Sequence, residues 1–337
     1  MDITPELKER AQALHRNCFV ADAHYDLLNL LAAKRLEGER TDVFRTDYLE
    51  KIRAGGVDLL ISSIFIDDRH VPEMALRRAL DQIACMHEEL AQCPDLVLCR
   101  SVGEIRAARA AGKIALLLSF EGAEPLGNDL NLLRVFYELG VRGIGIVWSR
   151  RNYAADGCFF QPRREGRKGG LTDFGARLAD EAERLGMYLD VSHLNDEGFW
   201  DLCSLTKRPF IASHSNCRAL APHCRNLTDE MIRVMAEKGG LVGLNYCAGF
   251  LDDQPSPDLC RSTTALMAKH AAHFKQVGGI EIIGLGSDFD GIGGKLELSD
   301  CSKMPLLADA LRKEGFTEDE VEAIFFRNAQ RFFENNL

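Results

Sequence analysis

The sequence lacks several features that would place it in a common class. It has no run of 18 uninterrupted apolar residues, so we expect no transmembrane span. Positive charge is also scarce: Lys and Arg total 41 against 51 Asp and Glu, a net charge of −10. This argues against nucleic acid or an anionic membrane as the main partner. Segment 1–17 has a charged helical pattern without an apolar core, so no secretory signal is visible and we expect a cytoplasmic protein.

The eleven cysteines include no CxxC pair. Most lie in apolar stretches, as Cys85, Cys203 and Cys247 do, which favours thiols buried as small hydrophobic side chains in a reducing compartment. A zinc site built from cysteine thiolates is therefore not expected.

Short apolar runs alternate with longer amphipathic segments along the whole chain. Hydrophobic residues make up 46% of the 337 residues, which is ample for a core. The apolar runs cover 18–24, 56–65, 113–122, 141–148, 186–193, 208–215, 240–246 and 280–291. Each run is short, β-branched or Leu-rich, and flanked by Gly, Pro or Asp, which is typical of strands buried on both faces.

Helix-like segments lie between these runs, at 71–92, 129–140, 172–186, 195–206 and 228–240. Eight strands alternating with helices predict an α/β fold, a closed (β/α)8 barrel of the TIM type, with added helices at 1–17 and 317–337. An open doubly wound sheet is the alternative, but no Gly-rich phosphate loop follows the first run. No linker or repeat interrupts the chain, so we expect one domain, residues 1–337.

Imidazole and carboxylate side chains stand where five of the predicted strands end. They are His24 and Asp26, then Glu121, His193, His214, and finally Asp288 with Asp290. A single residue of this kind is more often an ordinary loop residue. The carboxyl ends of barrel strands meet on one face, where such folds carry their active sites, so the coincidence predicts one site.

The spacing of these residues suits two metal ions. Side chains alternate along a strand, so His24 and Asp26 share a face and could hold one cation, while His193 and His214 on adjacent strands could hold a second. Glu121 has two oxygens with which it could bridge both. Imidazole and carboxylate without thiolate suit zinc or a similar divalent ion. Two such ions would polarise a carbonyl and hold a hydroxide.

Asp288, at the last strand, is placed to act as the general base that takes a proton from that water. Asp22 precedes His24 on the same face and is a candidate to orient a ligand. The remaining histidines fall into two groups. His15, His87, His270 and His273 lie in helical segments and are predicted to be surface or packing residues, and His70 and His223 lie in loops without an evident partner.

Six stretches together carry a family resemblance: "DAHYDLL", "SFEGAEPL", "GLTDFGARLADEAERLGMYLDVSH", "PFIASHSNCRAL", "RNLTDEMIRVMAEKGGLVGLNY" and "GLGSDFDGI". Across nearly the whole chain they resemble the membrane dipeptidase (renal dipeptidase) family of zinc peptidases, peptidase family M19, in its soluble bacterial form. The resemblance implies a barrel of the metal-dependent hydrolase type with two Zn²⁺ per chain and usually a homodimer. It assigns His24 and Asp26 to one zinc, His193 and His214 to the other, and Glu121 to the bridge.

The resemblance also implies roles in catalysis and substrate binding. It makes Asp288 the acid and base beside the bridging hydroxide, and places Arg225 on the C-terminal carboxylate of the substrate, which a planar guanidinium binds bidentately. Many members carry a histidine that contacts the developing oxyanion where this chain has Trp148. An indole offers a single N–H donor. Oxyanion stabilisation would then rest more on zinc or on another donor such as Asn152.

The expected function is hydrolysis of free dipeptides by a zinc-dependent dipeptidase, through attack of the bridging hydroxide. Members of the family often accept a D-residue at the C-terminal side. One alternative is another binuclear amide hydrolase on this barrel, acting on a lactam or an N-acyl amino acid. Another is a binding barrel without turnover, against which the complete set of predicted ligands weighs.

Overall fold

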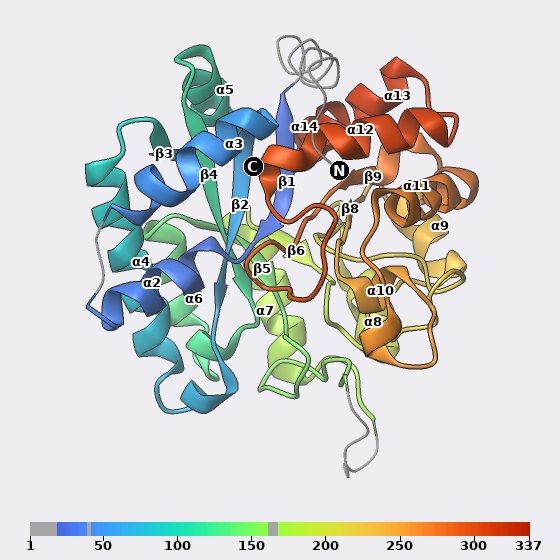
Figure 1. Ribbon diagram of the computed structural model, residues 1–337. Coiled ribbons are helices and arrows are strands. Elements are labelled where there is room, and N and C mark those ends of the chain that lie inside the picture. Colours follow the sequence, from blue (N-terminus) through green and yellow to red (C-terminus); the bar gives the residue numbers. More distant parts are fainter. Residues whose placement is uncertain (1–18, 39–41, 161–167) are drawn as a thin grey trace.

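Eight parallel strands close into a barrel at the centre of the molecule (Figure 1). The computed structural model describes residues 19–38, 42–160 and 168–337, so the helix predicted over 1–17 lies outside the described residues. The barrel strands are β1 (Val20–Tyr25), β2 (Val57–Phe65), β4 (Ile114–Glu121), β5 (Val141–Gly145), β6 (Tyr188–Asp190), β7 (Ile211–Ala212), β8 (Leu241–Leu244) and β9 (Ile283–Leu285). They pair in the order β2–β1–β9–β8–β7–β6–β5–β4, and β2 also pairs with β4, which closes the ring.

Each predicted apolar run coincides with one barrel strand, so the predicted (β/α)8 fold is confirmed. The strands are mostly shorter than the runs because most runs continue into the loops that flank each strand. A further strand, β3 (Leu96–Leu98), escapes the sequence pattern. It has three residues and pairs only with β4, outside the barrel, so it is too short to show a period.

Helices surround the barrel in Figure 1. The five predicted between strands are α4 (Ala75–Gln92), α6 (Asn131–Glu138), α7 (Asp173–Leu185), α8 (Asp196–Leu205) and α9 (Asp229–Glu237). Helix α7 shows why the sequence marked its ends: the Thr172 hydroxyl accepts a hydrogen bond from the Gly175 N–H at 3.0 Å, and Gly186 ends the helix at φ 80°. Helices that the pattern did not single out are α2 (Leu27–Leu36), α3 (Leu49–Gly55), α5 (Val102–Ala110), α10 (Ala248–Leu251), α11 (Thr264–Gly278) and α12 (Met304–Lys313).

The predicted C-terminal helix forms α13 (Glu318–Glu322) and α14 (Asn328–Asn336), joined by a π-helical turn. Apolar side chains from the barrel interior pack with α14: the rings of Phe332 and Phe333 lie 5.9 and 5.6 Å from the ring of Tyr188 in β6. In Figure 1, α14 lies at the upper end of the barrel, near the start of β1. The amino-terminal end of the barrel is thus filled, and the polar residues gather at the carboxyl end.

Among the described residues, no helix combines the length and the apolar character needed to cross a lipid bilayer.

Candidate metal centre

The predicted ligands and the predicted catalytic Asp288 come from the carboxyl ends of five strands. His24 lies in β1, Asp26 directly follows it, and Glu121 is the last residue of β4. His193 and His214 lie just after β6 and β7. Asp288 follows β9. All six residues are buried, with exposed fractions of 8% or less. The barrel therefore brings together residues that are far apart in the sequence.

Two groups of side chains meet at Glu121, which belongs to the first and also lies beside the second. The first group is Glu121, His193 and His214: Glu121 Oε1 lies 3.0 Å from His193 Nε2 and 3.6 Å from His214 Nε2. The two Nε2 atoms are 2.9 Å apart. Both imidazoles therefore aim the same nitrogen at one carboxylate oxygen.

The second group is His24, Asp26 and Asp288. His24 Nε2 lies 3.7 Å from Asp26 Oδ2 and 4.0 Å from Asp288 Oδ1. The other oxygen of Glu121, Oε2, is 3.7 Å from the same His24 nitrogen. Glu121 thus has one oxygen beside each group.

Serine and aspartate side chains behind the histidines fix which nitrogen faces the site. Ser213 Oγ donates to Asp190 Oδ2 at 2.5 Å and lies 2.8 Å from His214 Nδ1. Because the Ser213 proton points to the carboxylate, His214 Nδ1–H donates to Ser213, and His214 Nε2 keeps its lone pair toward Glu121. On the other histidine of this group, His193 Nδ1 lies 2.7 Å from Ser149 Oγ.

Three carboxylates around the second group are also held in place. The Ser63 hydroxyl donates to Asp26 Oδ1, and Asn245 Nδ2 donates to Asp288 Oδ2 at 2.9 Å. Asp22 accepts from the Ser287 backbone N–H at 2.9 Å, which joins β1 to the loop after β9. Asp22 thus holds the residue that directly precedes Asp288, and its role in orienting a ligand stays a prediction.

The backbone is strained at this end of the barrel. Among the described residues, three that are not glycine have positive φ: His193 at 71°, Asp288 at 63° and Asp290 at 67°. Left-handed conformations cost a residue with a Cβ about 1 kcal/mol or more, and such strain clusters at functional sites. Two of these three are predicted site residues. Asp290 accepts a hydrogen bond from the Tyr48 hydroxyl at 2.7 Å.

Burial dominates the protonation of Glu121 and Asp288. It raises the pKa of Glu121 well above its ordinary value, and the neighbouring Asp26 carboxylate raises it further. Burial also raises the pKa of Asp288 to about 7. Burial acts to lower the pKa of His24, but the carboxylates of Glu121, Asp26 and Asp288 outweigh it and raise this pKa to about 10. The site therefore holds more negative charge than its buried surroundings stabilise.

The other two imidazoles are neutral. Burial lowers the pKa of His193 well below its ordinary value, and the positive charges of Arg225 and His24 act in the same direction. Burial also lowers the pKa of His214 well below its ordinary value, and the positive charges of His24 and Arg225 lower it further. Neutral imidazole is the form that binds metal ions.

The donor set fits divalent metal ions. His24 Nε2 is buried and has no hydrogen-bond partner among the described residues, although three carboxylates surround it. The Nε2 atoms of His193 and His214, with Glu121 between the groups, add imidazole and carboxylate donors without thiolate. This chemistry suits zinc.

A cavity of about 340 Å³ opens above these residues. Trp148 lines it, with its ring 5.2 Å from that of Phe65 and 5.4 Å from that of Phe160. The guanidinium of Arg150 lies 5.1 Å from the Trp148 ring. The indole is thus clamped by its neighbours and forms a rigid aromatic wall.

Arg225 reaches the site from the loop after β7. Its side chain is 3% exposed, and Nη2 donates to the backbone carbonyl of His214 at 2.8 Å. Its Nε has no hydrogen-bond partner among the described residues. His223, which had no evident partner in the sequence, accepts from the Arg225 backbone N–H at 3.2 Å through Nδ1. Arg225 therefore presents a buried donor beside the cluster.

Asn152 has a different place from the one its predicted role needs. Its Nδ2 donates to the Ile146 carbonyl at 2.9 Å, and its Oδ1 accepts from the backbone N–H groups of Ala154 and Ala155. The side chain is occupied in its own loop.

Sequence reasoning missed the residues that orient the ligands, chiefly Asp190, Ser149, Ser213 and Asn245. Asn245 carried a signal, because it closes the apolar run of β8, the one strand end between His214 and Asp288 to which no ligand was assigned. The cysteine interpretation holds for most of the described thiols. Cys247, however, is half-buried and lines the cavity, and Cys224 is exposed.

Comparison with known proteins agrees with this geometry. Residues 8–336 match the family model of the membrane dipeptidases, peptidase family M19. Human dipeptidase 3 is 29% identical over 340 residues, a match that covers 98% of this chain and 67% of the relative. The solved structure of dipeptidase AC, an M19 metallopeptidase, is 30% identical with a TM-score of 0.86, covering 95% of this chain and 98% of its own.

A second solved structure is similar to the same degree. It is a metallopeptidase from Rhodobacter sphaeroides liganded with a phosphinate mimic of the dipeptide L-Ala-D-Ala. It is 28% identical with a TM-score of 0.86, and the match covers 95% of this chain and 99% of that one.

Proposed function

Because the chain belongs to the membrane dipeptidase family, peptidase family M19, we propose that this metallo-dipeptidase binds two zinc ions in the cluster and hydrolyses free dipeptides there. His24 and Asp26 would hold one ion and His193 and His214 the other. The position of Glu121 carries the proposal, since its two oxygens lie 3.0 Å from His193 Nε2 and 3.7 Å from His24 Nε2. One carboxylate therefore reaches both groups.

When bound, the two ions would polarise the scissile carbonyl and supply a hydroxide at neutral pH. The chain's own residues do the rest. Arg225 binds the C-terminal carboxylate of the dipeptide through its unpartnered Nε, and Trp148 packs against the substrate. Asp288 is held through Oδ2 by Asn245, which leaves Oδ1 to take the proton of the attacking water and pass it to the leaving amine.

A D-residue at the C-terminal side belongs to the proposal. The Rhodobacter sphaeroides relative is liganded with a mimic of L-Ala-D-Ala, which supports this stereochemistry for the present chain. The cytoplasmic location and the homodimer stay predictions from composition and resemblance.

The test is a panel of L,L and L,D dipeptides and one tripeptide, assayed with and without added zinc. We expect zinc-dependent hydrolysis of dipeptides, with the tripeptide a poor substrate. Metal content is measured on the same preparation. A protein that retains well under one zinc per chain after growth with zinc, and cleaves no dipeptide, would overturn the proposal.

Arg225→Ala separates a dipeptidase from another amide hydrolase. We expect kcat/KM for dipeptides to fall about 100-fold or more, because a charge-assisted hydrogen bond to the substrate carboxylate is lost. Arg233→Ala, on the exposed face of α9, is the matched control and should leave the rate unchanged. Unchanged activity of Arg225→Ala would show that the proposed dipeptide pose is wrong.

A further inference from the structure

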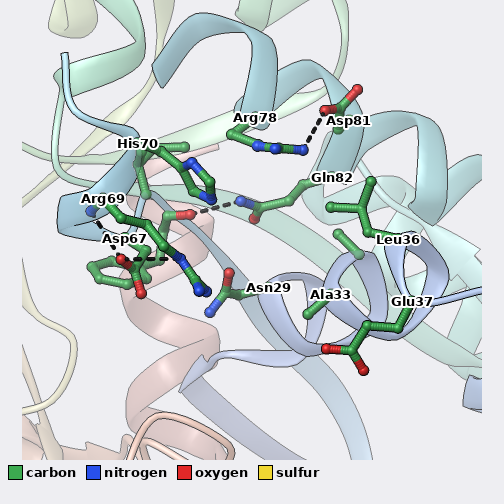
Figure 2. Close-up of a pocket in the computed structure, with 13 residues that line it drawn as sticks. Asn29, Ala33, Leu36, Glu37, Asp67, Arg69, His70, Arg78, Asp81 and Gln82 are labelled. Carbon is green, nitrogen blue, oxygen red and sulfur yellow. Dashed lines mark hydrogen bonds and ion pairs between the residues drawn. The ribbon is translucent and has the colours of Figure 1, made fainter. Parts of the chain in front are cut away.

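A second cavity lies beside the catalytic one. Its volume is about 280 Å³, and it lies between α2, the end of β2 and α4 (Figure 2). Asn29 of α2 and Phe65, the last residue of β2, line both cavities. The two spaces therefore share a wall, and a group bound at the metal cluster has this cavity as its neighbour.

An unpartnered buried acceptor marks the second cavity. Gln82 of α4 is 3% exposed, and its Nε2 donates to the Phe65 carbonyl at 2.6 Å. Its Oε1 has no hydrogen-bond partner among the described residues. Figure 2 shows the Gln82 amide at the cavity, with Asn29 and Arg69 nearby. A buried amide oxygen without a donor costs free energy, so a ligand with a donor would be favoured here.

The charges of the lining favour the same kind of ligand. Three carboxylates, Glu37, Asp67 and Asp81, stand against two guanidinium groups. Arg69 pairs with Asp67 at 3.4 Å and Arg78 with Asp81 at 3.3 Å. The carboxylate of Glu37 has no such counterion in this set. The cavity thus offers an acceptor and a net negative charge to a cation or a neutral donor.

The order of the strands around the barrel indicates which part of a substrate would face this cavity. Three strands on each side separate β2 from β7, so the two lie opposite each other in the barrel. Arg225 is anchored beside the end of β7 through the His214 carbonyl. A dipeptide with its carboxylate on Arg225 therefore extends across the metal cluster toward β2 and Phe65, and its N-terminal residue comes nearest to the second cavity.

We infer that this cavity is the subsite for the side chain of the substrate's N-terminal residue, and that it selects long side chains ending in a hydrogen-bond donor, such as those of Lys, Arg and Gln. The Gln82 amide oxygen receives the donor, and His70, for which the sequence suggested no partner, forms part of the rim. The inference rests on the proposed dipeptidase function and names its substrate class.

The test compares dipeptides with a common C-terminal residue and Ala, Met, Gln or Lys at the N-terminus. Met matches Gln in length and lacks the donor. We expect kcat/KM for the Gln and Lys substrates to exceed that for the Met substrate about tenfold, the effect of one net hydrogen bond. Ala33→Phe fills the cavity from α2, at a residue outside the catalytic lining. It should lower kcat/KM for Gln and Lys about tenfold and leave the Ala substrate within twofold.

Ala84→Phe, the same change on the exposed face of α4, is the matched control and should alter none of the rates. Circular dichroism checks that each variant folds. If Ala33→Phe does not fold, the smaller substitution Ala33→Leu takes its place. Equal rates for Met, Gln and Lys substrates, or an equal loss on all four in the cavity-filling variant, would overturn the subsite. Absence of hydrolysis of every dipeptide by the zinc-loaded wild type would instead overturn the proposed function, and the subsite with it.

Discussion

At the scale of single residues, the candidate site depends on side chains that touch no substrate. Ser213 Oγ accepts a hydrogen bond from His214 Nδ1–H and donates one to Asp190 Oδ2. The same oxygen lies 3.4 Å from His24 Nδ1. One hydroxyl thus orients an imidazole from each half of the cluster. Residues of this kind set the direction and basicity of metal ligands.

We therefore expect Ser213→Ala to weaken zinc binding about 10- to 100-fold, because His214 loses the acceptor that fixes its tautomer. The measurement is competition for zinc against a chelator of known affinity. Ser204→Ala removes a hydroxyl from the exposed side of α8 and serves as the control. Equal zinc affinity in Ser213→Ala and the wild type would show that the serine does not orient the ligands.

The residues that sequence reasoning found and those it missed differ in a physical respect. His24, Glu121 and Asp288 interrupt or end long apolar runs, and a titratable group in such a place is conspicuous. Ser213 and Asp190 lie within equally apolar stretches, but their partners are set by three-dimensional contacts between neighbouring strands. Asn152 was named only as another donor beside Trp148, and both its amide nitrogen and its oxygen bond within its own loop.

At the scale of elements, the boundaries of strands and capped helices could be predicted because local chemistry decides them. Thr228 illustrates this: its hydroxyl accepts from the Met231 N–H at 3.2 Å at the start of α9. Helix α2 departs from this rule: its cap position is Asp26, whose side chain makes no capping bond and belongs to the group with His24 and Asp288. At this helix start, the Asp26 carboxylate serves the candidate metal site and not the helix cap.

Helix α11 is joined to the site-bearing loops by His270. The Cys217 N–H donates to His270 Nδ1 at 3.1 Å, and Nε2–H donates to the Leu251 carbonyl at 3.0 Å. Burial lowers the pKa of His270 from 6.5 to about 4. The unfolded chain therefore binds more protons between these values, so this residue's contribution to stability is complete above pH 6.5 and falls as the pH drops toward 4, by about 3 kcal/mol in total.

We expect His270→Asn to flatten this part of the pH dependence. The Asn carbonyl can replace Nδ1 as acceptor but cannot protonate, so the free energy of unfolding should be lower than that of the wild type at pH 7 and should fall less between pH 6.5 and 4. Urea unfolding at several pH values measures both. His87→Asn, on the exposed side of α4, is the control. Parallel pH profiles for His270→Asn and the wild type would contradict the burial of a neutral imidazole.

At the scale of the whole molecule, the cluster joins strands that are far apart in the sequence. Its members come from β1, β4, β6, β7 and β9, which surround most of the barrel. At the opposite end the interior is closed by apolar contacts of α14, which need no ion. Stability at the carboxyl end should then depend on bound cations, because three buried carboxylates lie close together there.

Removal of metal with a chelator should therefore lower the melting temperature by several degrees, and zinc should restore it. A ligand present at about 1,000 times its dissociation constant stabilises the folded state by about 4 kcal/mol. Differential scanning calorimetry on chelated and zinc-loaded protein measures the shift. Glu121→Gln tests the cause, since an amide can occupy the bridge position without its negative charge and should reduce the shift produced by zinc. If zinc leaves the melting temperature of the wild type unchanged, or shifts Glu121→Gln to the same extent, the carboxylate bridge does not couple metal binding to the barrel.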